Sequence, residues 1–217
     1  LDFDNLAKED IYVLDSPILT NSQFKKFKKH FSKKIKIIDC TFSIISSLKD
    51  RIEVLREECE IAVREGTTTL ILSDKNVSNQ RASIPTILAV GAIHAHLVKL
   101  GLRGYCSINV EASDALDTHS FAVLIGVGAT TINPYLAIDS IYQRFEKKLF
   151  GKTDFESCIK KFKKSIDSGL LKIMSKMGIS VVSSYRGGCN FEAVGLSRAI
   201  VSDYFPGMSS RISGIGV

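Results

Sequence analysis

The sequence predicts an α/β fold in which strands and helices alternate and the strands form a parallel sheet. Two observations carry this prediction. From residue 35 onward, short β-branched and apolar runs alternate with longer stretches whose apolar residues recur at helical spacing. Of the 217 residues, 45% are hydrophobic and 24% are charged, which is typical of a globular protein and excludes a disordered chain. We expect a single domain over residues 1–217, with a lead-in over 1–34, a βα core over 35–206 and a tail over 207–217.

Five short runs have the composition of strands, because they are β-branched or apolar and end near polar residues. In chain order they are residues 35–38, 67–72, 105–110, 130–132 and 179–183. Asp39, Glu111 and Asn133 follow closely on three of these runs, which is expected where a strand leaves the core.

Seven stretches read as helices. In chain order they are residues 47–65, 84–100, 113–127, 134–149, 153–177, 191–194 and 197–204. Ser47 and Gly66 fit the start and the end of the first helix, and Pro85 fits the start of the second. That second helix has so few polar members that we expect it to be buried. Thr153 and Glu156 form a capping box for the long fifth helix.

The excess of positive charge behind the net +6 is mostly local, because six of the ten residues 25–34 are Lys. Phe27 and Phe31 within this run are spaced to share one face of a helix. A basic helix can contact a phosphate backbone, but lysines without Arg, Asn or stacking aromatic residues are a weak nucleic-acid signal. We therefore favour a solvated amphipathic helix and expect no nucleic-acid partner.

No basic segment is followed by an apolar segment, so we expect no secretory signal. His or Lys interrupts the apolar helical stretches before they reach transmembrane length, so we expect no membrane span. The five cysteines are odd in number and include no CxxC, which argues against a disulfide framework or a zinc knuckle and favours a reducing cytosol. Residue 1 is Leu and the first Met is Met174. We therefore expect an excised piece of a longer polypeptide.

Acidic residues lie where the predicted strands end, and ligands of parallel α/β proteins bind at that edge. Asp39, Asp74 and Glu111 could bind Mg²⁺ there. Alternatively, these residues simply end strands and cap the helices that follow. Because no phosphate-binding loop or spaced motif accompanies them, we favour the second interpretation. A free-standing βα-barrel enzyme with a Mg-binding carboxylate site stays as the alternative function.

The histidines and the last cysteine form no motif. His94 and His96 are two residues apart on a helix, so their side chains diverge by about 200°, whereas a helical zinc pair needs a spacing of four. We expect one hydrogen-bonded core histidine and one at the surface, and His119 also reads as structural. Cys189 has no histidine near it in the sequence to activate it, and the Gly-Gly pair at 187–188 predicts a turn with positive φ.

Eight segments of the chain share a pattern with a known protein family. They are LAVGAIHAHL (88–97), GLR (101–103), FAVLIGVG (121–128), INPYLA (132–137), GLLKIMSKMGIS (169–180), SYRG (184–187), FEAVGL (191–196) and SRISG (210–214). In this order they resemble the central domain of glutamate synthase. The resemblance runs from Ser16 to the last residue and is most specific over residues 169–196.

The resemblance implies a place in the large subunit, or single chain, of glutamate synthase. That enzyme makes two L-glutamate from L-glutamine and 2-oxoglutarate with electrons from NADPH or ferredoxin. In the family, an N-terminal amidotransferase domain with a terminal Cys nucleophile releases ammonia. An FMN-binding β/α barrel with a three-cysteine iron–sulfur cluster performs the reductive step.

The resemblance also implies a role and partners for the central domain, which joins those two domains and helps enclose the ammonia route. Its topology is related to that of the FMN barrel, so the sheet is expected to resemble a partial or degenerate TIM-type barrel. The implied partners are the amidotransferase and FMN domains of the same chain, with a small NADPH-oxidising subunit or ferredoxin. The implied location is the cytoplasm, or a plastid for a ferredoxin-dependent enzyme.

None of the family's catalytic or cofactor-binding residues carries over to this sequence. Residue 1 is Leu rather than the nucleophilic Cys, and the nearest two cysteines, Cys40 and Cys59, are 19 residues apart, so the cluster triplet is absent. We therefore expect no catalytic, cofactor-binding or metal-binding residue here and an inactive domain in isolation. Tyr185 and Arg186, expected at a strand end near the next domain, are the candidates for an interdomain contact.

Overall fold

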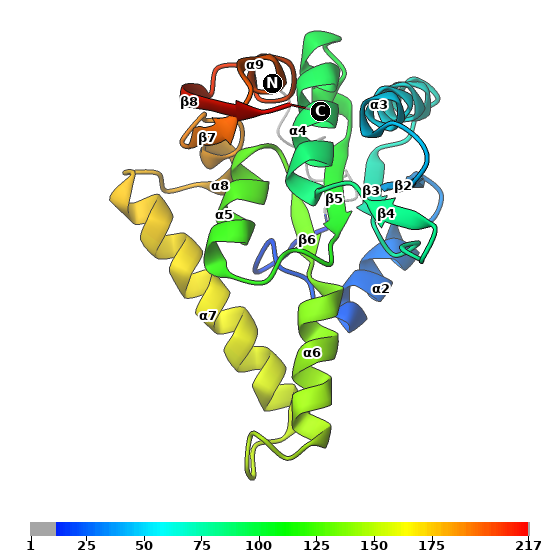
Figure 1. Cartoon of the computed structure of the whole chain (residues 1–217). Helices are drawn as coiled ribbons and strands as arrows, with labels where there is room; N and C mark the ends of the chain where they lie inside the picture. The colour runs from blue at the N-terminus through cyan, green and yellow to red at the C-terminus, as the bar shows by residue number, and fades with distance from the viewer. Residues whose placement is uncertain (1–11, 217) are drawn as a thin grey trace, which may run out of the picture.

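A central parallel sheet of four strands organises the protein (Figure 1); the computed structural model describes residues 12–216. The strands lie in the order β1 (Ile35–Asp39), β3 (Thr69–Ser73), β5 (Ser107–Glu111) and β6 (Thr131–Asn133). Each runs parallel to its neighbours. The predicted α/β fold is confirmed, and within residues 12–216 the sheet stays open and does not close into a barrel.

The two faces of the sheet are covered by different parts of the chain. Leu70 and Leu72 of β3 belong to the main core, together with residues of α3 (Leu48–Arg64), α4 (Thr86–Lys99) and α5 (Thr118–Gly126). Ile71 points the other way, because successive side chains of a strand alternate between faces.

Ile71 packs there with Phe24 and Phe27 of the Lys-rich helix α2 (Asn21–His30). The predicted amphipathic helix is confirmed, with its phenylalanines inward and most of its lysines exposed. The lead-in is also bound to the sheet edge, since Ile132 N of β6 donates to Pro17 O and Leu19 N donates to Ile132 O, both at 2.8 Å.

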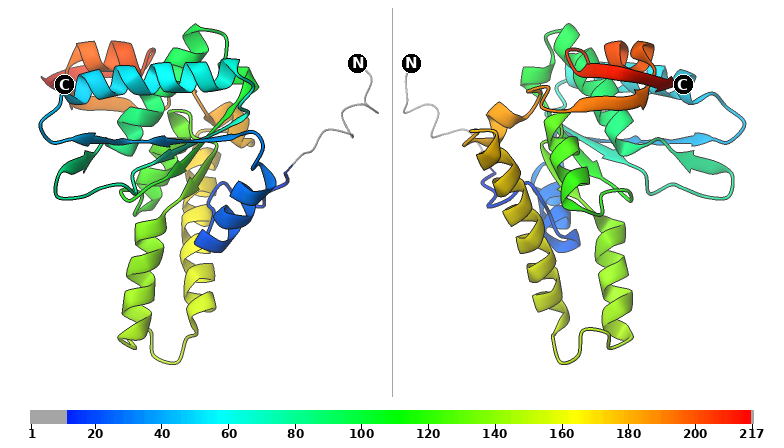
Figure 2. Two further views of the ribbon diagram at one scale, coloured as in Figure 1. Left: turned by 90° about the vertical axis from the view of Figure 1, so that its right-hand side faces the viewer. Right: turned by 60° about the vertical axis from the view of Figure 1, so that its left-hand side comes forward.

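Two further elements project from the sheet in opposite directions (Figures 1 and 2). Helices α6 (Tyr135–Glu146) and α7 (Phe155–Lys176) form a long hairpin that points away from the core. At the other end, β7 (Glu192–Leu196) and β8 (Ser209–Ile215) pair in parallel beside α9 (Arg198–Tyr204). No helix among residues 12–216 has both the length and the apolar character needed to cross a membrane.

Several local predictions were wrong near the chain's end. The helix expected at 191–194 is absent, and residues 192–194 belong to β7 instead. Ala193 is buried between the exposed Glu192 and Val194, which is the alternation of a strand. The expected strand at 179–183 is replaced by the single turn α8 (Val182–Tyr185). The tail at 207–217 contains β8, whose partner strand the sequence did not reveal.

Smaller differences concern turns and helix starts. Two short strands were not predicted: β4 (Arg81–Ser83) pairs antiparallel with β2 (Thr41–Ser43). Ser47 caps α3 as predicted. In contrast, α5 is capped by Asp117 rather than starting at 113, and α7 is capped by Asp154 rather than Thr153.

Gly91 of α4 lies tightly against the carboxyl end of α9. A Cβ at this position would lie 2.9 Å from the backbone oxygen of Tyr204 and would overlap the ring of Phe205. Glycine is therefore required by space, since the neighbouring atom is backbone that has no room to move away.

We predict that Gly91→Ala lowers the free energy of unfolding by about 1–3 kcal/mol, because the added methyl group overfills a packed interface. Gly104→Ala is the matched control, since no atom lies within 4 Å of a Cβ built there. Urea unfolding of both variants measures the difference. Equal stability of the two variants would contradict the proposed tight packing of α4 against α9.

Candidate functional site

The carboxyl ends of β1, β3 and β5 bring three polar side chains into register. Asp39 pairs with Ser73 across β1 and β3, and Ser73 pairs with Glu111 across β3 and β5. Asp39 and Glu111, two of the three acidic residues considered as possible Mg²⁺ ligands, therefore lie on the same edge, separated by one strand.

Glu111 is buried and already has cationic partners. Its carboxylate accepts hydrogen bonds from Ser73 Oγ at 2.8 Å, from Lys28 Nζ at 3.1 Å and from Lys75 Nζ at 2.9 Å. Burial acts to raise the pKa of Glu111, but the hydrogen bonds from Lys75, Ser73 and Lys28 outweigh it and hold the pKa below its usual value. The sequence did not reveal Lys28 as a partner, because it belongs to the Lys run.

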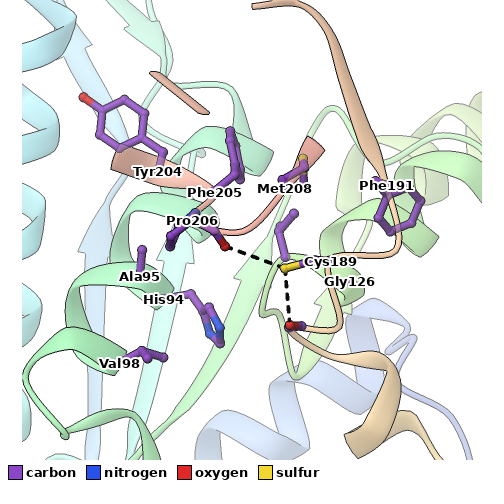
Figure 3. A pocket seen from close by; sticks show the side chains of 12 residues that line it. His94, Ala95, Val98, Gly126, Cys189, Phe191, Tyr204, Phe205, Pro206 and Met208 are labelled. Atoms are coloured by element: carbon purple, nitrogen blue, oxygen red, sulfur yellow. Dashed lines mark hydrogen bonds between the residues drawn. The ribbon is translucent and has the colours of Figure 1, made fainter. Parts of the chain in front are cut away.

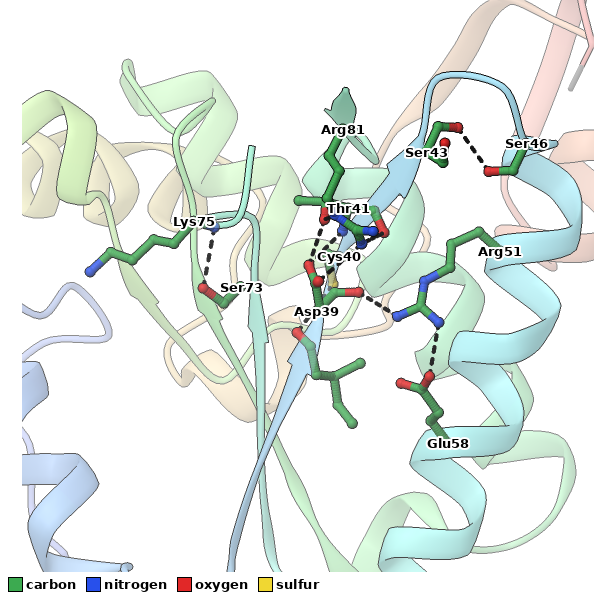
Figure 4. A network of polar contacts seen from close by, with 11 residues as sticks. Asp39, Cys40, Thr41, Ser43, Ser46, Arg51, Glu58, Ser73, Lys75 and Arg81 are labelled. Atoms are coloured by element: carbon green, nitrogen blue, oxygen red, sulfur yellow. Dashed lines mark hydrogen bonds and ion pairs between the residues drawn. The ribbon is translucent and has the colours of Figure 1, made fainter. Parts of the chain in front are cut away.

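Asp39 is engaged by a different set of groups (Figure 4). Its Oδ1 accepts from Thr41 Oγ1 at 2.7 Å, and its Oδ2 forms an ion pair with Arg81 Nη2 at 3.0 Å. Partial burial acts to raise the pKa of Asp39, but hydrogen bonds, mainly from Thr41, and the Arg81 charge lower it. Arg51 adds a hydrogen bond to the backbone oxygen of Asp39 at 2.6 Å.

Asp74 is the third of these acidic residues, and its side chain is hydrogen-bonded to the loop that follows β5. Its Oδ2 accepts from the backbone nitrogen of Ser113 at 2.9 Å and from the Ser113 hydroxyl. Within residues 12–216, no group of three or more His, Cys, Asp or Glu side chains is placed to hold a metal ion. Each of the three carboxylates is thus hydrogen-bonded or ion-paired to groups of the chain itself.

A second polar cluster lies around the turn that follows α5. Arg103 donates to His94 Nδ1 at 3.1 Å and to Gly128 O at 2.9 Å, and Arg186 donates to Ala129 O at 3.1 Å. His94 is thus the hydrogen-bonded histidine that we expected. His96 points elsewhere and meets Glu60 at 3.0 Å.

His94 also lines a small cavity of about 170 Å³ (Figure 3). The same cavity is lined by Cys189, whose Sγ lies 3.6 Å from Pro206 O, and by Gly187, whose φ of +73° confirms the predicted turn. Sequence spacing could not show that His94 and Cys189 share a pocket. Burial, followed by the charges of Arg103 and Arg186, lowers the pKa of His94 to about 4.

The other cysteines are buried and free. Burial raises the pKa of the Cys40, Cys59 and Cys106 thiols, so these groups stay protonated at neutral pH.

The two candidates for an interdomain contact lie at the end of α8 rather than at a strand end. Tyr185 is 1% exposed and packs edge-on against Phe191, with ring centroids 6.2 Å apart. Arg186 is half-buried. An interdomain contact at these residues stays a prediction.

We predict that His94 makes stability fall as the pH drops. A histidine in the unfolded chain titrates near 6.5, so between about pH 6.5 and 4 the unfolded state binds a proton that the folded state does not. His94→Gln should therefore lose less stability than the wild type between pH 7 and pH 5, by about 1 kcal/mol after allowance for partial exposure. His119→Gln, at an exposed position, is the control for denaturant unfolding at both pH values. Identical pH dependence in all three proteins would contradict the prediction.

Comparison with known proteins agrees with the resemblance. The family model described as glutamate synthase central domain matches residues 3–197. The large chain of NADPH glutamate synthase from Azospirillum brasilense is 52% identical over 98% of this chain, and that from Bacillus subtilis is 43% identical over 93%. The chloroplastic ferredoxin-dependent glutamate synthase of Oryza sativa is 40% identical over 95%. The chain spans only 13–15% of the length of these relatives. This chain belongs to the glutamate synthase central domain family.

Proposed function

We propose that this chain serves as the non-catalytic connecting domain of a glutamate synthase. The whole enzyme would make two L-glutamate from L-glutamine and 2-oxoglutarate, with electrons from NADPH or ferredoxin. The observation that carries the proposal is the 52% identity to a glutamate synthase large chain over 98% of this chain.

The charges at the sheet edge support a structural role. The carboxylates of Glu111 and Asp39 are bound by lysines and an arginine of the chain itself, and Asp74 is bound by a loop. A general base or a metal ligand has to be free to meet a substrate or an ion, whereas these groups hold the fold together.

An exposed apolar surface supports the connecting role. On β7 and β8, Val194, Ile212 and Ile215 are 64%, 61% and 75% exposed. They lie near a groove of about 430 Å³ lined by residues of α4, α5, α9, β7 and β8. Contiguous apolar surface of this kind is typical of contact with other protein surface.

We assign the amidotransferase and FMN domains of the same chain as the neighbours, with Arg186 at one contact and the buried Tyr185 positioning it. The domain would join them and help to enclose the route of ammonia between them. FMN and the iron–sulfur cluster would be bound outside this segment. A small NADPH-oxidising subunit or ferredoxin would supply electrons, in the cytoplasm or, for the ferredoxin type, in a plastid.

An assay of the isolated chain tests the non-catalytic role. For the isolated chain we expect a cooperative thermal transition, no glutaminase turnover, no FMN absorbance and no bound iron. The full-length enzyme should show glutaminase turnover, FMN absorbance and bound iron. The full-length enzyme assayed in parallel is the positive control. Turnover, or stoichiometric FMN or iron in the isolated chain, would contradict the proposal.

A further inference from the structure

Two arginines meet at one turn of the protein. Arg103 Nη2 donates to Gly128 O at 2.9 Å, and Arg186 Nε donates to Ala129 O at 3.1 Å. These carbonyl groups belong to consecutive residues, and the charge of Arg186 acts on Arg103, so the two guanidinium groups are neighbours. Gly187 N anchors the same corner by donating to Gly126 O at 2.8 Å.

This pair has no acidic partner among residues 12–216. None of the ion pairs of the described chain includes Arg103 or Arg186. Three other arginines with partly buried side chains each bind a carboxylate: Arg51 binds Glu58, Arg56 binds Asp203 and Arg81 binds Asp39. Arg103 and Arg186 therefore differ from these three arginines in having no carboxylate partner among the described residues.

The hydrogen bonds of Arg103 and Arg186 use some of their N–H donors but do not neutralise the two positive charges. Arg103 donates to His94 Nδ1 and to the carbonyl oxygens of Cys106 and Gly128, all of which are neutral groups. The end of α5 offers about half a negative charge, against two full positive charges. Burial lowers the pKa of both arginines, which is the direction expected when a charge lacks a counterion. Withdrawing such charges from water is costly unless they are paired.

Arg186 keeps the hydrogen-bonding capacity that an anion needs. Only its Nε has an acceptor among the described residues, and neither terminal nitrogen is among the buried atoms that lack a partner. The two terminal nitrogens thus reach the surface as a planar fork, which matches the two oxygens of a carboxylate. The buried Tyr185 before it and the anchored Gly187 after it hold the backbone in place.

We propose that Arg186, with Arg103 beside it, binds the carboxylate of an Asp or Glu side chain from another domain of the parent glutamate synthase. This inference rests on the proposed function and gives the predicted contact at Arg186 a specific chemistry. Charge complementarity argues for an acidic group. The relatives are far longer than this chain, which spans 15% of the Azospirillum protein, so most of their surface lies on other domains.

Carbodiimide cross-linking of the full-length enzyme tests the inference. In the Arg186→Lys variant the new amine keeps the positive charge, and a carboxylate in contact with it is joined to it as an amide. Mass spectrometry of the digest should identify residue 186 linked to an Asp or Glu outside residues 1–217. Arg198→Lys is the matched control, because Arg198 is exposed and forms no ion pair in the described chain, and we expect at least tenfold less of such a product there.

Two results would overturn the inference. The first is a cross-link at 186 that involves only residues 1–217, or a yield no higher than at 198. The second is thermal stabilisation of the full-length enzyme by acetate that Arg186→Gln abolishes, because the site would then be open to a free carboxylate. Glutamate formation by the wild-type enzyme is measured in parallel. Activity without the cross-link overturns the contact alone, whereas a wild-type enzyme without activity overturns the proposed function.

Discussion

The buried carboxylate of Glu111 is the point on which the fold depends most. It lies at the end of β5 and is bound by Ser73 of β3, by Lys28 of α2 and by Lys75 of the loop that follows β3. A charge that is 4% exposed is tolerable only when it is paired and hydrogen-bonded. The same pairing joins the lead-in to the sheet, so that α2 is held both by the packing of Phe24 and Phe27 and by the ion pair of Lys28.

The two polar clusters differ in charge balance. This difference distinguishes the cluster that stabilises the fold from the one that we propose contacts another domain. At the carboxyl ends of the strands, acidic groups meet lysines and arginines of the same chain. At the turn after α5, Arg103 and Arg186 meet only carbonyl groups and the neutral His94 within the described residues. In the first cluster the ionised Glu111 and Asp39 have cationic partners, whereas the second has capacity for a further negative charge.

The sequence predicted the sheet well because its strands are short and rich in apolar or β-branched residues, and β3, β5 and β6 are buried almost throughout. β3 is buried at all five positions, and such a run has few alternatives to a covered strand. Ser47 and the Lys-rich helix were predicted for similarly local reasons. The pairing of β7 with β8 was missed because neither segment is stable alone, and their partners are set by contacts across the chain.

The polar clusters were predictable only in part. Asp39, Asp74 and Glu111 could be placed at strand ends from the pattern. The cationic partners of Glu111 are Lys28 and Lys75, and that of Asp39 is Arg81, and no local pattern connects these residues. The spacing of His94 and His96 predicted that their side chains diverge, and the two rings do meet different partners, Arg103 and Glu60. The spacing did not reveal that His94 shares a cavity with Cys189. Such contacts depend on the tertiary packing of α4, α5 and α8 and leave no periodic signal in the sequence.

The most direct measurement of the central claim, that the sheet edge serves stability rather than chemistry, is a comparison of Glu111→Gln with the wild type in the full-length enzyme. We predict a free energy of unfolding lower by about 1–3 kcal/mol, because Lys28 and Lys75 lose their shared counterion. The rate of glutamate formation per folded, FMN-loaded enzyme should stay within twofold of the wild type. A large loss of that rate with unchanged stability would contradict the account.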